Sequence, residues 1–242
     1  MPFYPITRFI DGFRQGYFMA MDATDVFSQW ALAGKDEGME RGHAPSVSQM
    51  LDLVLPKVPE VFEAIDLGCG NGWVVRLLSK LGATHVEGVD GSLEMIEKAK
   101  MTDSNGIYSH GLLPDWRPSQ RFDLVHSMEF LYYLKDPEEM LALIHDEWLK
   151  DGGFLVAGVD HYLENEDSHG WPEALDVHMT LLSEAQWKQA MIDAGGTSEG
   201  GLSTTNDFMW TNSTSIINQS GTIPDIEKIM GTLPLSPFNK DT

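Results

Sequence analysis

The fold is decided by one stretch, Ala64-Ile-Asp-Leu-Gly-Cys-Gly-Asn-Gly72, in which a short apolar run ends in an acid and three alternate glycines. Glycine has no Cβ and reaches positive φ without strain, so a strand that ends this way can turn sharply and approach a ligand closely. A second apolar run, residues 85–90, ends on another acid, Asp90. Such an acid can accept both hydroxyls of a ribose. Together the two features predict an adenosine-containing ligand across the carboxyl ends of neighbouring parallel strands.

The spacing of the glycines separates two classes of cofactor. A dinucleotide-binding turn needs a third small residue, which lets the following helix pack closely and direct its N-terminus at a pyrophosphate. That position is occupied by Trp73, the bulkiest side chain available. A pyrophosphate ligand is therefore disfavoured. We interpret Cys69, the only cysteine, as a small packing residue in the turn because nothing in the sequence marks it as an activated nucleophile.

The turn resembles motif I of the class I S-adenosylmethionine-dependent methyltransferases, and the match is carried by Asp66, Gly68, Gly70, Asn71 and Gly72. The resemblance extends over residues 60–200. It implies S-adenosylmethionine as cofactor and S-adenosylhomocysteine as product. In that family the glycine turn faces the methionine part of the cofactor, the first acid orients its amino group, and the acid after the second strand holds the ribose. By resemblance these roles fall to the turn residues, to Asp66 and to Asp90.

Further cofactor contacts are expected just after the other strands, where ligands bind in open α/β sheets. The predicted cofactor-binding residues are Asp66, Gly68, Cys69, Gly70, Asn71, Gly72, Asp90, Gly91, Ser92, His110, Gly111, Leu112, Ser127 and Met128. Many relatives carry an acid for the adenine amino group after the third strand, whereas this chain has His110 there. The adenine contact is thus open, and Leu112 could form an apolar wall.

Four residues are candidates for catalysis: Glu129, Asp160, His161 and Tyr162. Glu129 follows the fourth strand, where it could accept a proton near the methyl group; the alternative is a solvent-facing acid at a helix start. The other three follow the fifth strand. His161 titrates in the range of a base at neutral pH, and the alternative is a hydrogen-bonded structural histidine.

No metal is expected. Catechol-type methyltransferases carry an acid after the fourth strand and an Asp-Asn pair near the end of the fifth, but this chain has His126-Ser127 and Asp160-His161 at those places. Its eight histidines are scattered and do not form a ligand cluster.

Alternating strand and helix patterns predict an α/β core over residues 59–221, a Rossmann-like doubly wound sheet. The resemblance implies seven strands, of which the last two are placed at Phe208–Trp210 and Ser215–Ile217. Residues 1–58 are predicted to form an N-terminal helical cover, with helices at 22–33 and 46–58 joined by a mobile, glycine-rich link at 34–43. Residues 222–242 form a C-terminal tail without an assigned role.

The charge balance excludes some partners. Sixteen basic residues face 37 acidic ones, a formal net charge of -21. Such a surface repels phosphate backbones and anionic lipids, so we expect neither nucleic acid nor membrane as partner; a saline habitat is an alternative source of the acidity. One cysteine, no signal-peptide pattern and no apolar run near ~20 residues favour a cytoplasmic protein, either a monomer or a homodimer.

The sequence thus predicts methyl transfer from S-adenosylmethionine to the N, O or S atom of a small molecule by in-line displacement. A neutral or cationic acceptor is mildly favoured because acids gather near the expected pocket mouth. Two other classes stay open. One is a catalytically idle S-adenosylmethionine-binding regulatory module, and the other, less favoured, is an NAD-dependent oxidoreductase.

Overall fold

A computed structural model describes residues 21–195 and 207–211 of the 242-residue chain. The strand predicted at Ser215–Ile217 and the tail predicted at 222–242 lie outside these described residues, as do the first 20 residues of the predicted cover.

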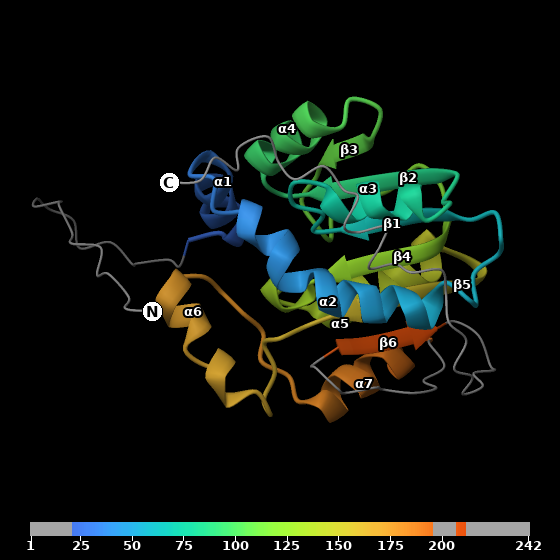
Figure 1. The fold of residues 1–242 in the computed structure, drawn as a ribbon. Helices are drawn as coiled ribbons and strands as arrows, with labels where there is room; N and C mark the ends of the chain where they lie inside the picture. Colours follow the sequence, from blue (N-terminus) through green and yellow to red (C-terminus); the bar gives the residue numbers. More distant parts are fainter. Residues whose placement is uncertain (1–20, 196–206, 212–242) are drawn as a thin grey trace, which may run out of the picture.

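The described residues form one six-stranded sheet with the order β3-β2-β1-β4-β5-β6 (Figure 1). Its strands are β1 (Glu63–Leu67), β2 (His85–Asp90), β3 (Ile107–His110), β4 (Phe122–Met128), β5 (Leu149–Gly158) and β6 (Asp207–Thr211). The first five are parallel, and β6 pairs with β5 in the antiparallel direction. The α/β prediction is confirmed. The strand count in the described part is lower than the predicted seven, since the last predicted strand falls outside it.

Helices lie on both faces of this sheet (Figure 1). They are α1 (Ala23–Leu32), α2 (Glu37–Val54), α3 (Trp73–Lys80), α4 (Leu93–Thr102), α5 (Pro137–Leu143), α6 (Trp171–Leu175) and α7 (Glu184–Asp193). Alternate residues of β1 enter two separate apolar clusters, Ala64 in one and Ile65 in the other, as expected for a strand buried on both faces. None of the described helices is long and apolar enough to cross a membrane.

The second cover helix corrects the predicted mobile link. α2 begins at Glu37 rather than at residue 46, so most of the segment 34–43 is helical despite Gly38 and Gly42. Tertiary contacts outweigh the weak helix propensity there. Asp36, just before the helix, is fully buried and binds Lys98 of α4 at 2.7 Å. The cover is therefore fixed to the core by the segment predicted to be loose.

The amphipathic pattern of residues 137–150 predicts a single helix, but the helix that the structure contains there is shorter. α5 ends at Leu143, and a single π-helical turn, Ile144–Trp148, leads directly into β5 at Leu149. Phe122 pairs with Leu149 and Leu124 with Phe154, so the register shifts between these two pairs. Gly152, at φ 76°, lies within this irregular segment. The glycines that follow this segment indicate the end of a helix in the sequence. In the structure they lie where the pairing of β4 with β5 is irregular.

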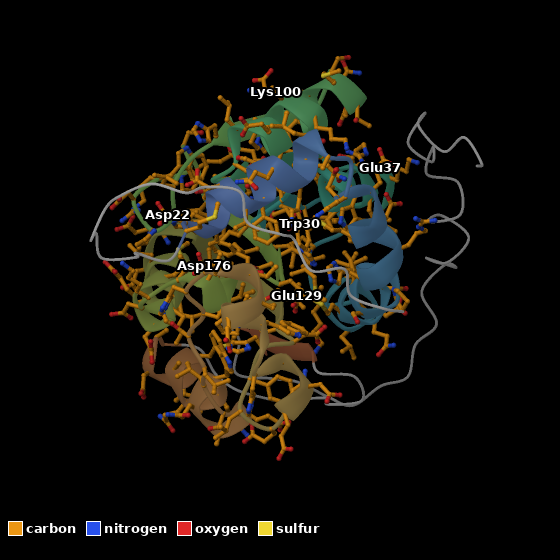
Figure 2. All side chains as sticks on the ribbon, turned by 90° about the vertical axis from the view of Figure 1, so that its left-hand side faces the viewer. Asp22, Trp30, Glu37, Lys100, Glu129 and Asp176 are labelled. Carbon is orange, nitrogen blue, oxygen red and sulfur yellow. The ribbon has the colours of Figure 1, made fainter. Side chains whose placement is uncertain are left out.

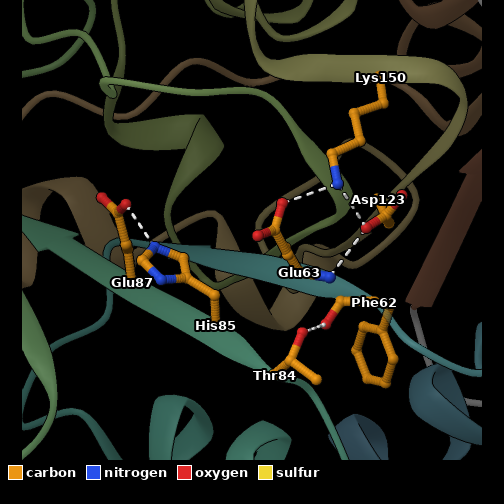
Figure 3. A network of polar contacts seen from close by, with 7 residues as sticks. All are labelled: Phe62, Glu63, Thr84, His85, Glu87, Asp123 and Lys150. Carbon is orange, nitrogen blue, oxygen red and sulfur yellow. Dashed lines mark hydrogen bonds and ion pairs between the residues drawn. The ribbon is translucent and has the colours of Figure 1, made fainter.

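A polar cluster ties the strands together at the end of the sheet where β1 and β4 begin (Figure 3). Asp123 Oδ2 accepts hydrogen bonds from the Glu63 backbone N–H and from Lys150 Nζ, both at 2.8 Å. The same ammonium reaches Glu63 Oε2 at 2.7 Å. Three strands are thus joined through two carboxylates and one ammonium.

We predict that Asp123→Ala lowers the free energy of unfolding by about 1–3 kcal/mol, because a backbone N–H and an ammonium lose their acceptor. Chemical denaturation measures this change. Cofactor affinity is expected to stay unchanged, since the cluster lies at the amino ends of the strands and the cofactor is expected at their carboxyl ends. Asp151→Ala, on an exposed residue of β5, is the control. Equal stability of the two variants would contradict the role of the cluster.

Candidate functional site

A cavity of about 840 Å³ opens where the parallel strands end. Figure 2 looks onto this side of the molecule, with Asp22, Trp30 and Glu129 labelled. All three line the cavity, together with residues that follow β1, β2, β4 and β5 and residues of α1 and α2. A smaller cavity adjoins it and shares Gly68, Gly70 and Met128 with it. The ends of the sheet and the helical cover therefore enclose a common space.

The glycine turn has the conformation that its sequence predicts. Gly68, Gly70 and Gly72 have φ values of 67°, 52° and 77°. A Cβ on Gly68 would lie 2.7 Å from Phe130, and one on Gly72 would lie 2.5 Å from Tyr108. A Cβ on Gly70 would meet nothing within 4 Å. Gly70 thus presents bare backbone to the cavity, where a ligand can approach closely.

Asp90 fixes the turn to the end of β2. Its Oδ2 accepts a hydrogen bond from the Gly70 N–H at 2.9 Å, and its Oδ1 accepts one from the Ser92 N–H at 2.7 Å. Burial raises the pKa of Asp90, and these two hydrogen bonds oppose the rise. The carboxylate lines the cavity, and each oxygen retains a lone pair. The arrangement fits a ribose whose two hydroxyls donate to one carboxylate.

The other predicted cofactor residues divide into three groups. Gly68, Gly70, Gly91, Gly111, Leu112 and Met128 line the large cavity, and Asp66, Cys69 and Asn71 line the small one. Gly72, Ser92, His110 and Ser127 line neither. Ser92 instead caps α4 by accepting from the Met95 N–H, and His110 contacts the Gly91 carbonyl from an exposed position. Burial raises the pKa of the Cys69 thiol well above its usual range, so the thiol stays protonated.

A buried pair that the sequence did not indicate lies beneath the turn. His126 Nδ1 is 2.7 Å from Asp66 Oδ1, and both side chains are almost completely buried. The two residues are direct neighbours in the register of β1 and β4. Burial raises the pKa of Asp66, and His126 lowers it in turn. Only the register of β1 with β4 brings the two side chains together, so local sequence patterns carry no signal for this pair.

Glu129 follows β4, lines the large cavity and has a strained backbone conformation. Its φ is 54°, uncommon outside glycine, and its N–H is held by the Gly158 carbonyl at 2.9 Å. Tyr132 donates its hydroxyl to Glu129 Oε2 at 2.7 Å. Burial raises the pKa of Tyr132 well above its usual range, so this hydroxyl remains a donor. Backbone strain of this kind gathers at functional sites, where surrounding contacts compensate for it.

The three residues after β5 are placed differently from one another. Asp160 lines the cavity, whereas His161 and Tyr162 are buried and do not. The His161 ring packs against Tyr132 and Trp171, with ring centroids 5.6 and 6.3 Å apart, and burial lowers its pKa. Catalytic roles for His161 and Tyr162 stay predictions, and these two side chains lie behind the residues that face the cavity.

The cover contributes site residues that the sequence analysis missed. Met39 and His43 of α2 line both cavities, and Phe27 and Trp30 of α1 line the large one. Spacings of three or four residues place each pair on one helical face. The spacing of Met39 and His43 is not recognised as helical when the second cover helix is predicted to begin at residue 46. Burial lowers the pKa of His43, and nearby Asp160 opposes this shift.

The large cavity has a marked excess of acids. Its carboxyl groups are Asp22, Asp90, Asp115, Glu129 and Asp160. No Lys or Arg of the described chain lines it, and His43 is the one basic side chain among its described lining residues. Within the described ranges no group of three or more His, Cys, Asp or Glu side chains is arranged to hold a metal ion.

Comparisons with known proteins agree with this geometry. A family model described as a methyltransferase domain matches residues 36–197. The chain is 28% identical over 145 residues to trans-aconitate 2-methyltransferase of Agrobacterium fabrum, covering 59% of this chain and 54% of that protein. It is 30% identical over 141 residues to dTDP-3-amino-3,4,6-trideoxy-alpha-D-glucopyranose N,N-dimethyltransferase of Streptomyces venezuelae, covering 56% of each. The chain spans about half the length of these curated relatives.

Solved structures of methyltransferases are also similar to this chain. A chain in the complex between the Haloferax volcanii Trm112 methyltransferase activator and a methyltransferase is 35% identical, with a TM-score of 0.65; the match covers 72% of this chain and 77% of that one. The structure of Streptomyces venezuelae DesVI is 22% identical, with a TM-score of 0.59 and coverage of 79% and 98%, and shows likeness of fold.

We predict that Asp90→Asn weakens S-adenosylhomocysteine binding at least tenfold, because a charged acceptor for two ribose hydroxyls is lost. Isothermal titration calorimetry measures the dissociation constant. Asp151→Asn is the control, since that residue is exposed and lies near the start of β5, away from the carboxyl ends of the strands. An unchanged dissociation constant in the Asp90 variant would remove the ribose assignment.

Proposed function

Because the chain belongs to the S-adenosylmethionine-dependent methyltransferase family, we propose that it transfers the methyl group of that cofactor to the amino nitrogen of a small, apolar-bodied cationic molecule. The observation that carries the proposal is the lining of the cavity beyond the glycine turn. It combines carboxylates with aromatic rings, and no Lys or Arg of the described residues lines it.

The aromatic side chains favour a cation in particular. Trp30, Tyr133 and Trp171 line the same cavity as Glu129 and Asp160, and Phe27 packs edge-on against Tyr133 at 5.3 Å between ring centroids. A cation over an aromatic face gains about 0.5–2 kcal/mol, more where water is excluded. The carboxylates add attraction of the same sign. An ammonium group attached to an apolar body satisfies both.

The curated relatives point to two acceptor chemistries, which this lining distinguishes. Trans-aconitate carries three carboxylates, which five carboxyl groups around the cavity would repel. The acceptor named for the Streptomyces venezuelae relative carries an amine, which agrees with the proposal, but also a nucleotide diphosphate, which does not. We therefore propose a small amine without phosphate or carboxylate groups.

The residues of the chain have a limited task in such a reaction. The bound cofactor supplies a methyl group already activated on a sulfonium. The cavity must hold the amine in line with it and away from water. An ammonium must also lose a proton before its nitrogen has a lone pair to donate. We assign this proton to Glu129, which the Tyr132 hydroxyl orients, with His43 as a second acceptor because its lowered pKa keeps it uncharged near neutral pH.

We predict that the protein methylates phenethylamine in preference to 3-phenylpropionate, which has a similar apolar body and the opposite charge. Glu129→Gln should lower kcat for the amine by about 10²-fold, the usual contribution of a positioned base. Affinity for S-adenosylhomocysteine should change less than twofold. Methylated product is quantified by mass spectrometry.

The control for that prediction is Glu138→Gln, on an exposed residue of α5. Preference for the carboxylate, or unaltered turnover in the Glu129 variant, would overturn the proposal. Tight S-adenosylhomocysteine binding without product from any amine, phenol or thiol would favour the remaining alternative, an idle cofactor-binding regulatory module. His161→Gln, assayed across pH, tests the separate prediction that His161 is the base.

The similarity to a chain solved with the Trm112 activator supports a second proposal, a protein partner of the same kind. Among the described residues β3 pairs with β2 alone, so its other edge can accept an added strand. Two apolar side chains are exposed there: Ile107 of β3 is 43% exposed and Met101 at the end of α4 is 83% exposed.

We predict that the chain co-purifies with Haloferax volcanii Trm112 when the two are co-expressed, and that Ile107→Lys abolishes the complex by placing a charge in the apolar contact. Size-exclusion chromatography reports the association. Val61→Lys, which alters an apolar residue that is 70% exposed just before the central strand β1 and not on the β3 edge, should leave it intact. Absence of a complex with the unaltered chain would contradict the proposed partner.

A further inference from the structure

Asp36 is the most completely buried acid of the helical cover. It lies in the turn between α1 and α2 and has no exposed surface. Its Oδ1 accepts a hydrogen bond from Lys98 Nζ of α4 at 2.7 Å, and its Oδ2 accepts one from Asn71 Nδ2 at 2.9 Å. A buried carboxylate is tolerated only when it is paired in this way. The cover is thus bound to the glycine turn through a single side chain.

This contact fixes the orientation of the Asn71 amide. An ionised carboxylate only accepts hydrogen bonds, so Asn71 must direct its NH₂ group at Asp36. The amide oxygen, Oδ1, then faces away from Asp36. It is buried and has no hydrogen-bond partner among the described residues. An unsatisfied buried acceptor costs about 1–3 kcal/mol, so an acceptor fixed in this state indicates that a donor arrives from elsewhere.

The cofactor can supply that donor. Asn71 lies between Gly70 and Gly72 and lines the smaller cavity beside Asp66 and His43. The amino-acid end of S-adenosylmethionine carries an α-ammonium with three N–H donors. The family places this end of the cofactor at the glycine turn. A short neutral acceptor beside Asp66 would complete the coordination of the ammonium without adding charge.

We propose that Asp36 is a positioning residue for the cofactor: it holds Asn71 so that Oδ1 accepts a hydrogen bond from the α-ammonium. Lys98 neutralises Asp36 and allows it to remain buried as an anion. Because Asp36 belongs to the cover, the cover must be in place for the amino-acid end of the cofactor to find its acceptor. The proposal rests on the family's cofactor and is independent of the acceptor class proposed above.

The test compares two ligands that share the adenosine and differ in the amino-acid end, where the proposed contact lies. S-adenosylhomocysteine carries the α-ammonium, whereas 5′-methylthioadenosine retains the adenosine and the thioether and lacks the amino acid. In the Asp36→Asn variant the amide introduced at position 36 can donate as well as accept a hydrogen bond. The side-chain amide of Asn71 can then turn over, so that its oxygen and not its NH₂ group faces position 36. Calorimetric titration should give a dissociation constant about tenfold weaker for S-adenosylhomocysteine and changed less than twofold for 5′-methylthioadenosine.

A double-mutant cycle supplies a readout from S-adenosylhomocysteine alone. Asn71→Ala removes the acceptor and should weaken binding about as much as Asp36→Asn. The double variant should be no weaker than Asn71→Ala, because Asp36 acts through Asn71. Asp25→Asn, on an exposed residue of the cover, is the matched control. Thermal unfolding without ligand verifies that each variant is folded.

Three results would overturn the proposal. Equal weakening of both ligands would mean that Asp36 only supports the cover. Additive effects of the two substitutions would mean that Asp36 acts without Asn71. An unchanged dissociation constant in both single variants would mean that the ammonium is bound elsewhere. Each of these results leaves the acceptor proposal intact, since that proposal is tested by product formation.

Discussion

The two hydrogen bonds that Asp90 accepts hold together the part of the structure on which the rest depends. They join the end of β2 to the glycine turn after β1 through the Gly70 N–H and to the start of α4 through the Ser92 N–H. The Val89 carbonyl adds bonds from the N–H groups of Gly68 and Cys69. These bonds fix three consecutive chain segments around one carboxylate, and that carboxylate borders the large cavity.

The cavity is completed by elements remote from this centre in sequence. The cover contributes aromatic and imidazole groups to the cavity lining, and Asp36 binds the cover to Asn71 of the turn and to Lys98 of α4. After β4, the strand next to β1, Glu129 is held at positive φ and hydrogen-bonded to Tyr132. The glycine turn and the strained Glu129 thus border the same cavity. The absence of Lys and Arg from the described lining gives this space its preference for positive charge.

Local patterns were sufficient to predict most of the fold. The strands and the turn at Gly68–Gly72 follow from apolar runs and glycine spacing, each of which acts over a few residues. The start of α2 and the pair Asp66–His126 could not be predicted this way. Burial of Asp36 decides the first, and the register of β1 with β4 decides the second, so both depend on contacts between distant segments. Asp160 and His161 both follow the end of β5, so the sequence predicts the same placement for both. In the structure Asp160 lines the cavity, whereas His161 is buried behind it.

We propose that the glycine turn and Asp90, which is joined to it, bind the amino-acid and adenosine parts of S-adenosylmethionine. Calorimetric titration of the unaltered protein with S-adenosylhomocysteine and, separately, with NAD tests it most directly. Saturable binding of S-adenosylhomocysteine and no heat from NAD is the predicted result. Binding of NAD, or no binding of S-adenosylhomocysteine, would contradict the account of the site.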